Sequence, residues 1–156
     1  MVHVNYTGEQ IKGYLFEIIR QMAKDNYRPD YIVGLTRGGL IPAVKLSQYL
    51  EIPMHALSPD ETNCWMAEDA YEGKKILVVD DINDTGKTIR ELKEDWRSTC
   101  HPDSERWPLV FASNVKFATL IDNEASEQFV NYAGLVINKL ENPEWCVFPW
   151  ERWWMK

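Results

Sequence analysis

A short apolar run followed by a turn and a helix occurs twice in this chain, over residues 31–50 and again over residues 75–97. Short runs of this kind are typical of strands buried on both faces. Alternation of such strands with helices predicts an α/β fold, a mainly parallel twisted sheet flanked by helices. Ligands bind these sheets at the carboxyl ends of the strands. The two turns at those ends, residues 36–39 and 80–88, are therefore the first places to look for a functional site.

The rest of the chain adds elements around these two units. Apolar residues recur at helical spacing after a capping box formed by Thr7 and Gln10, which predicts a helix from about Gly8 to Asp25. Residues 58–73 are polar, acidic and without a period, and are predicted to form a long loop. Helices are also expected over residues 40–50 and 86–97, and further strands over residues 52–57, 109–112, 115–121 and 134–137.

Length, charge and cysteine content narrow the class of protein. The 156 residues suggest one domain, 1–156. The formal net charge of −7 and the absence of a Lys/Arg run argue against nucleic acid as a partner. No apolar run approaches the length of a membrane span, so no membrane association is expected. Three widely spaced cysteines and no apparent leader favour the cytoplasm.

The turn after the second strand combines a phosphate-binding pattern with acids. Asp84-Thr85-Gly86-Lys87-Thr88 lies between a strand and a helix, where successive N–H groups form an anion site that suits one phosphate. Asp80 and Asp81 precede it; carboxylates accept hydrogen bonds from sugar hydroxyls and bind Mg²⁺. A phosphate site beside two acids indicates a sugar phosphate.

Two other interpretations of this turn remain open. The ending Gly86-Lys87-Thr88 also closes an ATP-binding P-loop, but that motif has a glycine where this chain has Asp81. In the second, Asp84 is an ordinary helix N-cap and the turn binds nothing.

The whole stretch, residues 76–88, resembles the 5-phosphoribosyl 1-pyrophosphate (PRPP) binding motif of type I phosphoribosyltransferases. The segment GLTRGGLIPA, residues 34–43, resembles the pyrophosphate loop of that family, and WCVFPWE, residues 145–151, resembles the base-binding segment of its xanthine-guanine members. Because order and spacing also agree, the resemblance covers nearly the whole chain. It is closest to the small purine enzymes of the xanthine-guanine and hypoxanthine-guanine type.

The resemblance implies transfer of a phosphoribosyl group from PRPP to a purine base, with release of pyrophosphate, in nucleotide salvage. The implied partners are PRPP, a purine base, the cofactor Mg²⁺ and a second copy or copies in a homodimer or homotetramer. Asp84 is the implied general base. The implied ligand contacts are Asp84, Thr85, Gly86, Lys87 and Thr88 for the 5′-phosphate; Asp80 and Asp81 for the ribose hydroxyls and, directly or through water, the metal; and Thr36, Arg37, Gly38 and Gly39 for pyrophosphate.

The base side departs from the family pattern. The resemblance implies a small C-terminal hood, about residues 123–151, in which Trp145 stacks on the base and the backbone of Cys146 reads its edge. Purine members have a lysine for the 6-oxo group where this chain has Asn123. Asn123 therefore either binds the base or is a turn residue that closes the strand.

The loop at 58–73 is the second departure, since the corresponding loop of the family is a flexible lid and here it is acidic. The two departures keep open a catalytically weak or inactive PRPP- or nucleotide-binding regulatory protein, or an enzyme for a different base.

Overall fold

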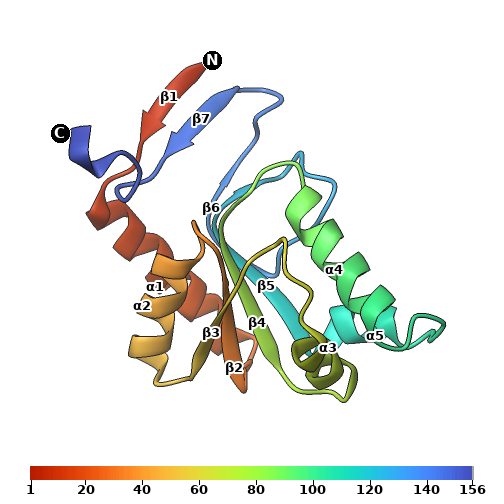
Figure 1. Ribbon diagram of the computed structural model, residues 1–156. Helices are drawn as coiled ribbons and strands as arrows, with labels where there is room; N and C mark the ends of the chain where they lie inside the picture. The colour runs from red at the N-terminus through yellow and green to blue at the C-terminus, as the bar shows by residue number, and fades with distance from the viewer. Residues whose placement is uncertain (156) are drawn as a thin grey trace.

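The computed structural model describes residues 1–155 and has a five-stranded sheet at its centre (Figure 1). The strand order is β3-β2-β4-β5-β6, and every neighbouring pair is parallel. The predicted α/β class with a parallel sheet is confirmed. The strands are β2 (Tyr31–Leu35), β3 (Met54–Leu57), β4 (Ile76–Asn83), β5 (Val115–Asn123) and β6 (Tyr132–Ile137).

Helices cover both faces of the sheet, because side chains alternate along each buried strand. In β4, Leu77 and Val79 pack into one core, whereas Ile76 and Val78 pack into the other. The first core lies under α1 (Gly8–Lys24) and α2 (Leu40–Leu50). The second lies under α3 (Cys64–Tyr71), α4 (Lys87–Thr99) and α5 (Trp107–Ser113). Of the helices in residues 1–155, none has the length and apolar character needed to cross a bilayer.

Two stretches fold differently from the sequence prediction. Residues 64–71, predicted as part of a loop, form α3, which Asn63 caps through its side chain and which buries Met66 and Ala70. Residues 109–112, predicted as a strand, belong to α5, which buries Trp107 and Val110. Both apolar runs are too short for periodicity alone to separate helix from strand, and packing against the sheet decides.

A separate two-stranded sheet lies above the carboxyl ends of the main strands (Figure 1). It pairs β1 (Val2–Asn5) with β7 (Glu144–Val147) in parallel, and the 3₁₀-helix η1 (Trp153–Met155) follows. Tyr6 anchors it, stacking on Phe148 with ring centroids 6.1 Å apart. The hood is therefore built from both ends of the chain, and the predicted C-terminal segment supplies only half of it.

Candidate active site

The two turns singled out in the sequence lie at the same edge of the sheet, because β2 and β4 are parallel neighbours. β4 is longer than predicted: residues 80–83 continue the strand and do not belong to the turn. The cause is β5, which pairs with this extension, Asp80 opposite Thr119 and Asn83 opposite Asp122. Asp80 and Asp81 are thus held by a strand, close to the ligand edge.

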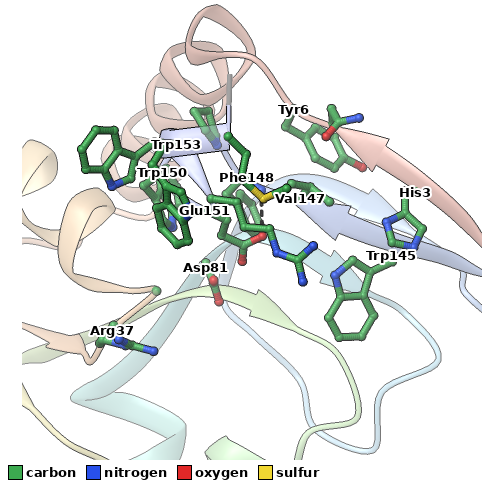
Figure 2. Close-up of a pocket in the computed structure, with 16 residues that line it drawn as sticks. His3, Tyr6, Arg37, Asp81, Trp145, Val147, Phe148, Trp150, Glu151 and Trp153 are labelled. Carbon is green, nitrogen blue, oxygen red and sulfur yellow. Dashed lines mark hydrogen bonds between the residues drawn. The ribbon is translucent and has the colours of Figure 1, made fainter.

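The loop Thr36–Gly39 is in direct contact with these acids. Its Thr36–Arg37 peptide bond is cis. A Cβ on Gly38 would lie 2.1 Å from Asp81 Oδ2, and one on Gly39 would lie 2.3 Å from the carbonyl oxygen of Val79. Only glycines permit this approach. The loop and Asp81 therefore form one wall of the site, from which the exposed Arg37 extends (Figure 2).

The adjacent carboxylates of Asp80 and Asp81 are partly buried. Burial, followed by the charge of Asp81, raises the pKa of Asp80 well above its usual range, and burial also raises the pKa of Asp81. One backbone N–H group donates to each carboxylate: that of Asp81 donates to Asp80 Oδ1 at 2.9 Å, and that of Ile82 donates to Asp81 Oδ1 at 2.8 Å. Two crowded oxygen donors of like charge suit a hard divalent cation. The residues present therefore fit Mg²⁺.

The start of α4 is open to an anion. Its N-cap is Gly86, at φ 94°, which has no side chain to cap the helix. Asp84 is thus not the N-cap, which removes the interpretation of the turn as an ordinary acidic cap. Thr85 Oγ1 accepts only a long hydrogen bond of 3.3 Å from the N–H of Lys87. A helix N-terminus with uncapped N–H groups and two flanking threonines suits one phosphate.

Replacing Gly86 with alanine tests this turn. A Cβ at Gly86 would lie 2.8 Å from the backbone nitrogen of Gln128, in addition to the cost of the left-handed backbone. We expect a loss of about 1–2 kcal/mol or more in the free energy of unfolding, and weaker PRPP binding. Denaturant titration and calorimetry measure the two.

Gly73 is the matched control, because it has φ 99° but nothing within 4 Å of an added Cβ. Gly73→Ala should show the backbone cost alone and bind PRPP normally. Equal effects of the two substitutions on PRPP binding would contradict this role of Gly86.

Asp84 has an ionic partner that sequence reasoning missed. Lys139 Nζ lies 3.0 Å from Asp84 Oδ1, and the lysine side chain is only 15% exposed. Lys139 lies in the connection from β6 to β7, fifty-five residues after Asp84 by their numbers. No local pattern around Lys139 indicates this contact. It arises because the fold brings the β6–β7 connection next to the β4–α4 connection, which carries Asp84.

Asn123 contacts the backbone of both residues of this pair. Its side-chain amide donates to the carbonyl oxygen of Asp84 at 2.9 Å. Its oxygen accepts from the N–H of Lys139 at 3.0 Å and from that of Ala125 at 3.3 Å. Asn123 is 6% exposed. The contacts therefore favour the second of the two interpretations, a residue that closes the strand, and they bind together the segments that carry Asp84 and Lys139.

A cavity of about 1050 Å³ separates the sheet edge from the hood. Figure 2 shows Arg37 and Asp81 on one side of it, and Trp145, Phe148 and Trp150 entering from the hood. Trp145 is 53% exposed, so it is not a core residue. Cys146 is buried between Trp145 and Val147 and lies outside the lining. Asp80, residues 84–88 and Asn123 also lie outside this lining.

The acidic segment does not cover the site as the predicted lid would. Residues 64–71 form α3, where Asp69 Oδ2 accepts from the hydroxyl of Tyr31 at 2.9 Å. The loop that remains, residues 58–63, lies beside α4: Ser58 and Glu61 share a small cavity with Thr88. Of the segment predicted as a lid, residues 58–63 therefore remain a loop before α3.

Comparison with known proteins agrees with this geometry. The sequence profile described as "Phosphoribosyl transferase domain" matches residues 6–152. The chain belongs to the phosphoribosyltransferase family. A solved purine phosphoribosyltransferase from Pyrococcus horikoshii superposes with a TM-score of 0.69 and 26% identity, over 97% of this chain and 95% of the other. The family predicted from the motifs is confirmed, and the predicted likeness to its purine members is confirmed by these similar proteins.

Curated phosphoribosyltransferases of two kinds are similar in sequence. The xanthine-guanine phosphoribosyltransferase of Cereibacter sphaeroides is 28% identical over 132 residues, 77% of this chain and 68% of the relative. The orotate phosphoribosyltransferase of Bartonella henselae is 33% identical over 96 residues, 60% of this chain and 47% of the relative. The chain thus spans about half the length of that orotate relative.

Proposed function

We propose that this phosphoribosyltransferase transfers the phosphoribosyl group of PRPP to a 6-oxopurine and releases pyrophosphate, a reaction of nucleotide salvage. The observation that carries the proposal is the Asp84–Lys139 pair, a carboxylate and an ammonium 3.0 Å apart beside the phosphate turn. Such a pair offers one acceptor for a ring N–H and one donor for an oxo group. The similarity to a xanthine-guanine enzyme, which extends over more of both chains than the orotate match, supports the same base class.

PRPP is held along the sheet edge in this proposal. The N–H groups and hydroxyls of residues 84–88 bind the 5′-phosphate, and Asp80 and Asp81 accept from the ribose hydroxyls. Arg37, with Thr36, Gly38 and Gly39, binds pyrophosphate, since a guanidinium matches two phosphate oxygens at once. Asp80 and Asp81 also hold Mg²⁺, directly or through water. When bound, the ion would neutralise negative charge on the pyrophosphate.

The base enters from the hood side. Trp145 stacks on its face, and the backbone on either side of Cys146 follows its edge. Asp84 accepts the proton that the base nitrogen loses. Lys139 donates to the 6-oxo oxygen and holds the Asp84 carboxylate in place through their ion pair. Asn123 supports both residues through hydrogen bonds to their backbone. Catalysis rests on positioning and on charge stabilisation of an oxocarbenium-like transition state.

A panel of bases with PRPP tests the function. We expect Mg²⁺-dependent release of pyrophosphate with guanine, xanthine or hypoxanthine, lost on chelation and restored by added Mg²⁺. Turnover with adenine, orotate or uracil should be absent or much slower. Exclusive turnover of orotate would show that the substrate base is orotate and that the proposed 6-oxopurine is wrong. Binding of PRPP by calorimetry with no turnover of any base would instead indicate a regulatory protein.

Quaternary structure and location complete the proposal. Trp153 and Trp154 are each 67% exposed at the end of the chain, which supports a homodimer or homotetramer formed partly through this aromatic surface. All three cysteines are free, which supports a reducing cytoplasm.

A further inference from the structure

A group of side chains of the types that ligate metals lies far from the candidate active site, at the opposite end of α4. It consists of Glu68 on α3 and the two residues that follow α4, Cys100 and His101. Since α4 begins at the phosphate turn and has 13 residues, its rise places these residues about 20 Å away. The proposed transferase mechanism uses none of the three.

The three ligand atoms converge on one point. Cys100 Sγ lies 2.8 Å from Glu68 Oε2, and His101 Nε2 lies 3.2 Å from Glu68 Oε1. One sulfur, one nitrogen and one oxygen atom lie within 4.8 Å of one another. In a tetrahedral zinc site, bond lengths of about 2.0–2.3 Å place neighbouring ligand atoms roughly 3.3–3.8 Å apart. Small side-chain rotations would bring all three atoms to such an ion.

The surrounding structure holds these side chains in place. The buried indole N–H of Trp107 donates to the carbonyl oxygens of Cys100 and His101, at 2.9 and 3.2 Å. The imidazole of His101 stacks on Tyr71, with ring centroids 4.0 Å apart. His101 has φ 51°, which is uncommon for a residue other than glycine and lets two successive side chains reach the same carboxylate. Supports of this kind fix the ligands of metal sites in proteins.

The donor set selects the class of metal. A thiolate, an imidazole and a carboxylate are the ligands of Zn²⁺ and similar transition metals, whereas Mg²⁺ and Ca²⁺ prefer oxygen atoms alone. Glu68 and His101 have half-exposed side chains, at 48% and 46%, so an ion can enter from solvent. Cys64, one turn before Glu68 on α3, is outside the group of three.

We propose that Glu68, Cys100 and His101 bind one Zn²⁺ ion that links α3 to the end of α4, with water in the fourth position. On binding, the Cys100 thiol loses its proton to solvent and a sulfur–zinc bond forms. The ion would stabilise the fold at a distance from the transferase site. This site is independent of the proposed transferase activity, and either proposal can fail without the other.

Cobalt and zinc titrations of the full chain test the site. Co²⁺ should give a thiolate-to-metal charge-transfer band and the strong visible absorption of tetrahedral cobalt, saturating at one ion per chain. Competition with a chromophoric chelator then gives the affinity for Zn²⁺. Zn²⁺ should also raise the Tm in a concentration-dependent way, as expected for a ligand that binds only the folded state.

Variants separate the proposed ligands from other thiols. His101→Gln, which changes an exposed ring, and Cys100→Ser should each lower the Zn²⁺ affinity at least about tenfold and abolish the zinc-dependent rise in Tm. Cys146→Ser is the matched control, because Cys146 is also buried and its Sγ lies 3.5 Å from a glutamate oxygen, that of Glu144. It should bind Co²⁺ and Zn²⁺ normally, as should Cys64→Ser.

Three results would overturn the assignment. They are absence of the cobalt charge-transfer band in the wild-type chain, an unchanged Zn²⁺ affinity in His101→Gln, and loss of the band in Cys64→Ser or Cys146→Ser. Because His101 is half exposed, its substitution reports on the metal even if Cys100→Ser fails to fold.

Discussion

Asp84→Asn will lower kcat/KM for the preferred base at least about tenfold, because general-base catalysis contributes roughly 10²–10⁴-fold and an amide cannot take up the proton. The side chain is 42% exposed, and its backbone carbonyl, which Asn123 binds, is unchanged, so the fold should be preserved. PRPP binding should change little, since the backbone N–H groups of the phosphate turn remain. Steady-state kinetics with pyrophosphate detection and calorimetry with PRPP measure the two effects.

The control for this substitution is Asp103→Asn, which removes the same charge from an exposed turn outside the site. It should leave kcat/KM unchanged. An Asp84→Asn enzyme with wild-type kcat/KM would refute the assignment of Asp84 as the base. A parallel loss of PRPP affinity and of turnover would show that Asp84 binds substrate and does not act as the base.

Lys139→Met will lower kcat/KM for 6-oxopurines roughly 10- to 100-fold, because a hydrogen bond to a charged donor contributes about 1.5–3 kcal/mol. Methionine keeps most of the apolar stem and removes the ammonium group. The loss should be specific: PRPP binding stays near wild type, and the preference for guanine, xanthine or hypoxanthine over adenine decreases. The same base panel, repeated with this variant, measures both effects.

Lys116 offers a closely matched control. The Lys116 side chain is 17% exposed, and its ammonium group pairs with Asp25 at 2.6 Å. The Lys139 side chain is similarly buried, at 15% exposed, and pairs with Asp84. Lys116 lies near the start of β5, at the other end of the sheet. Lys116→Met should cost stability but not base preference. If Lys139→Met slows every base equally, the lysine only positions Asp84 and the proposed specificity role is wrong.

Local patterns predict the parts of the proposed site that one segment supplies. The phosphate turn, the two acids and the pyrophosphate loop are each contiguous, and each contains the glycines that its backbone needs. Gly38 and Gly39 are necessary because the loop approaches Asp81 and Val79 too closely for a Cβ. A short motif carries this information because the constraint on the backbone is itself local.

Elements whose identity depends on distant partners were less predictable. The extension of β4 through Asn83 exists because β5 pairs with it. α3 and α5 form because their short apolar runs pack on the sheet as helices, although neither run is long enough to show a period. β1 is four residues long and pairs with a strand about 140 residues later in the chain.

The sequence alone determined the fold class and the family, because alternation of strands and helices and three contiguous motifs specify them, and it predicts the phosphate, ribose and pyrophosphate contacts. Only the tertiary structure decided which side chains surround Asp84. It showed that Asn123, at the position of the expected lysine, is occupied by backbone contacts, and that Lys139 reaches Asp84 from another connection. The physical reason is that any segment that the fold brings near a site can place a charged side chain in it. The spacing of residues along the chain does not show which distant segment that will be.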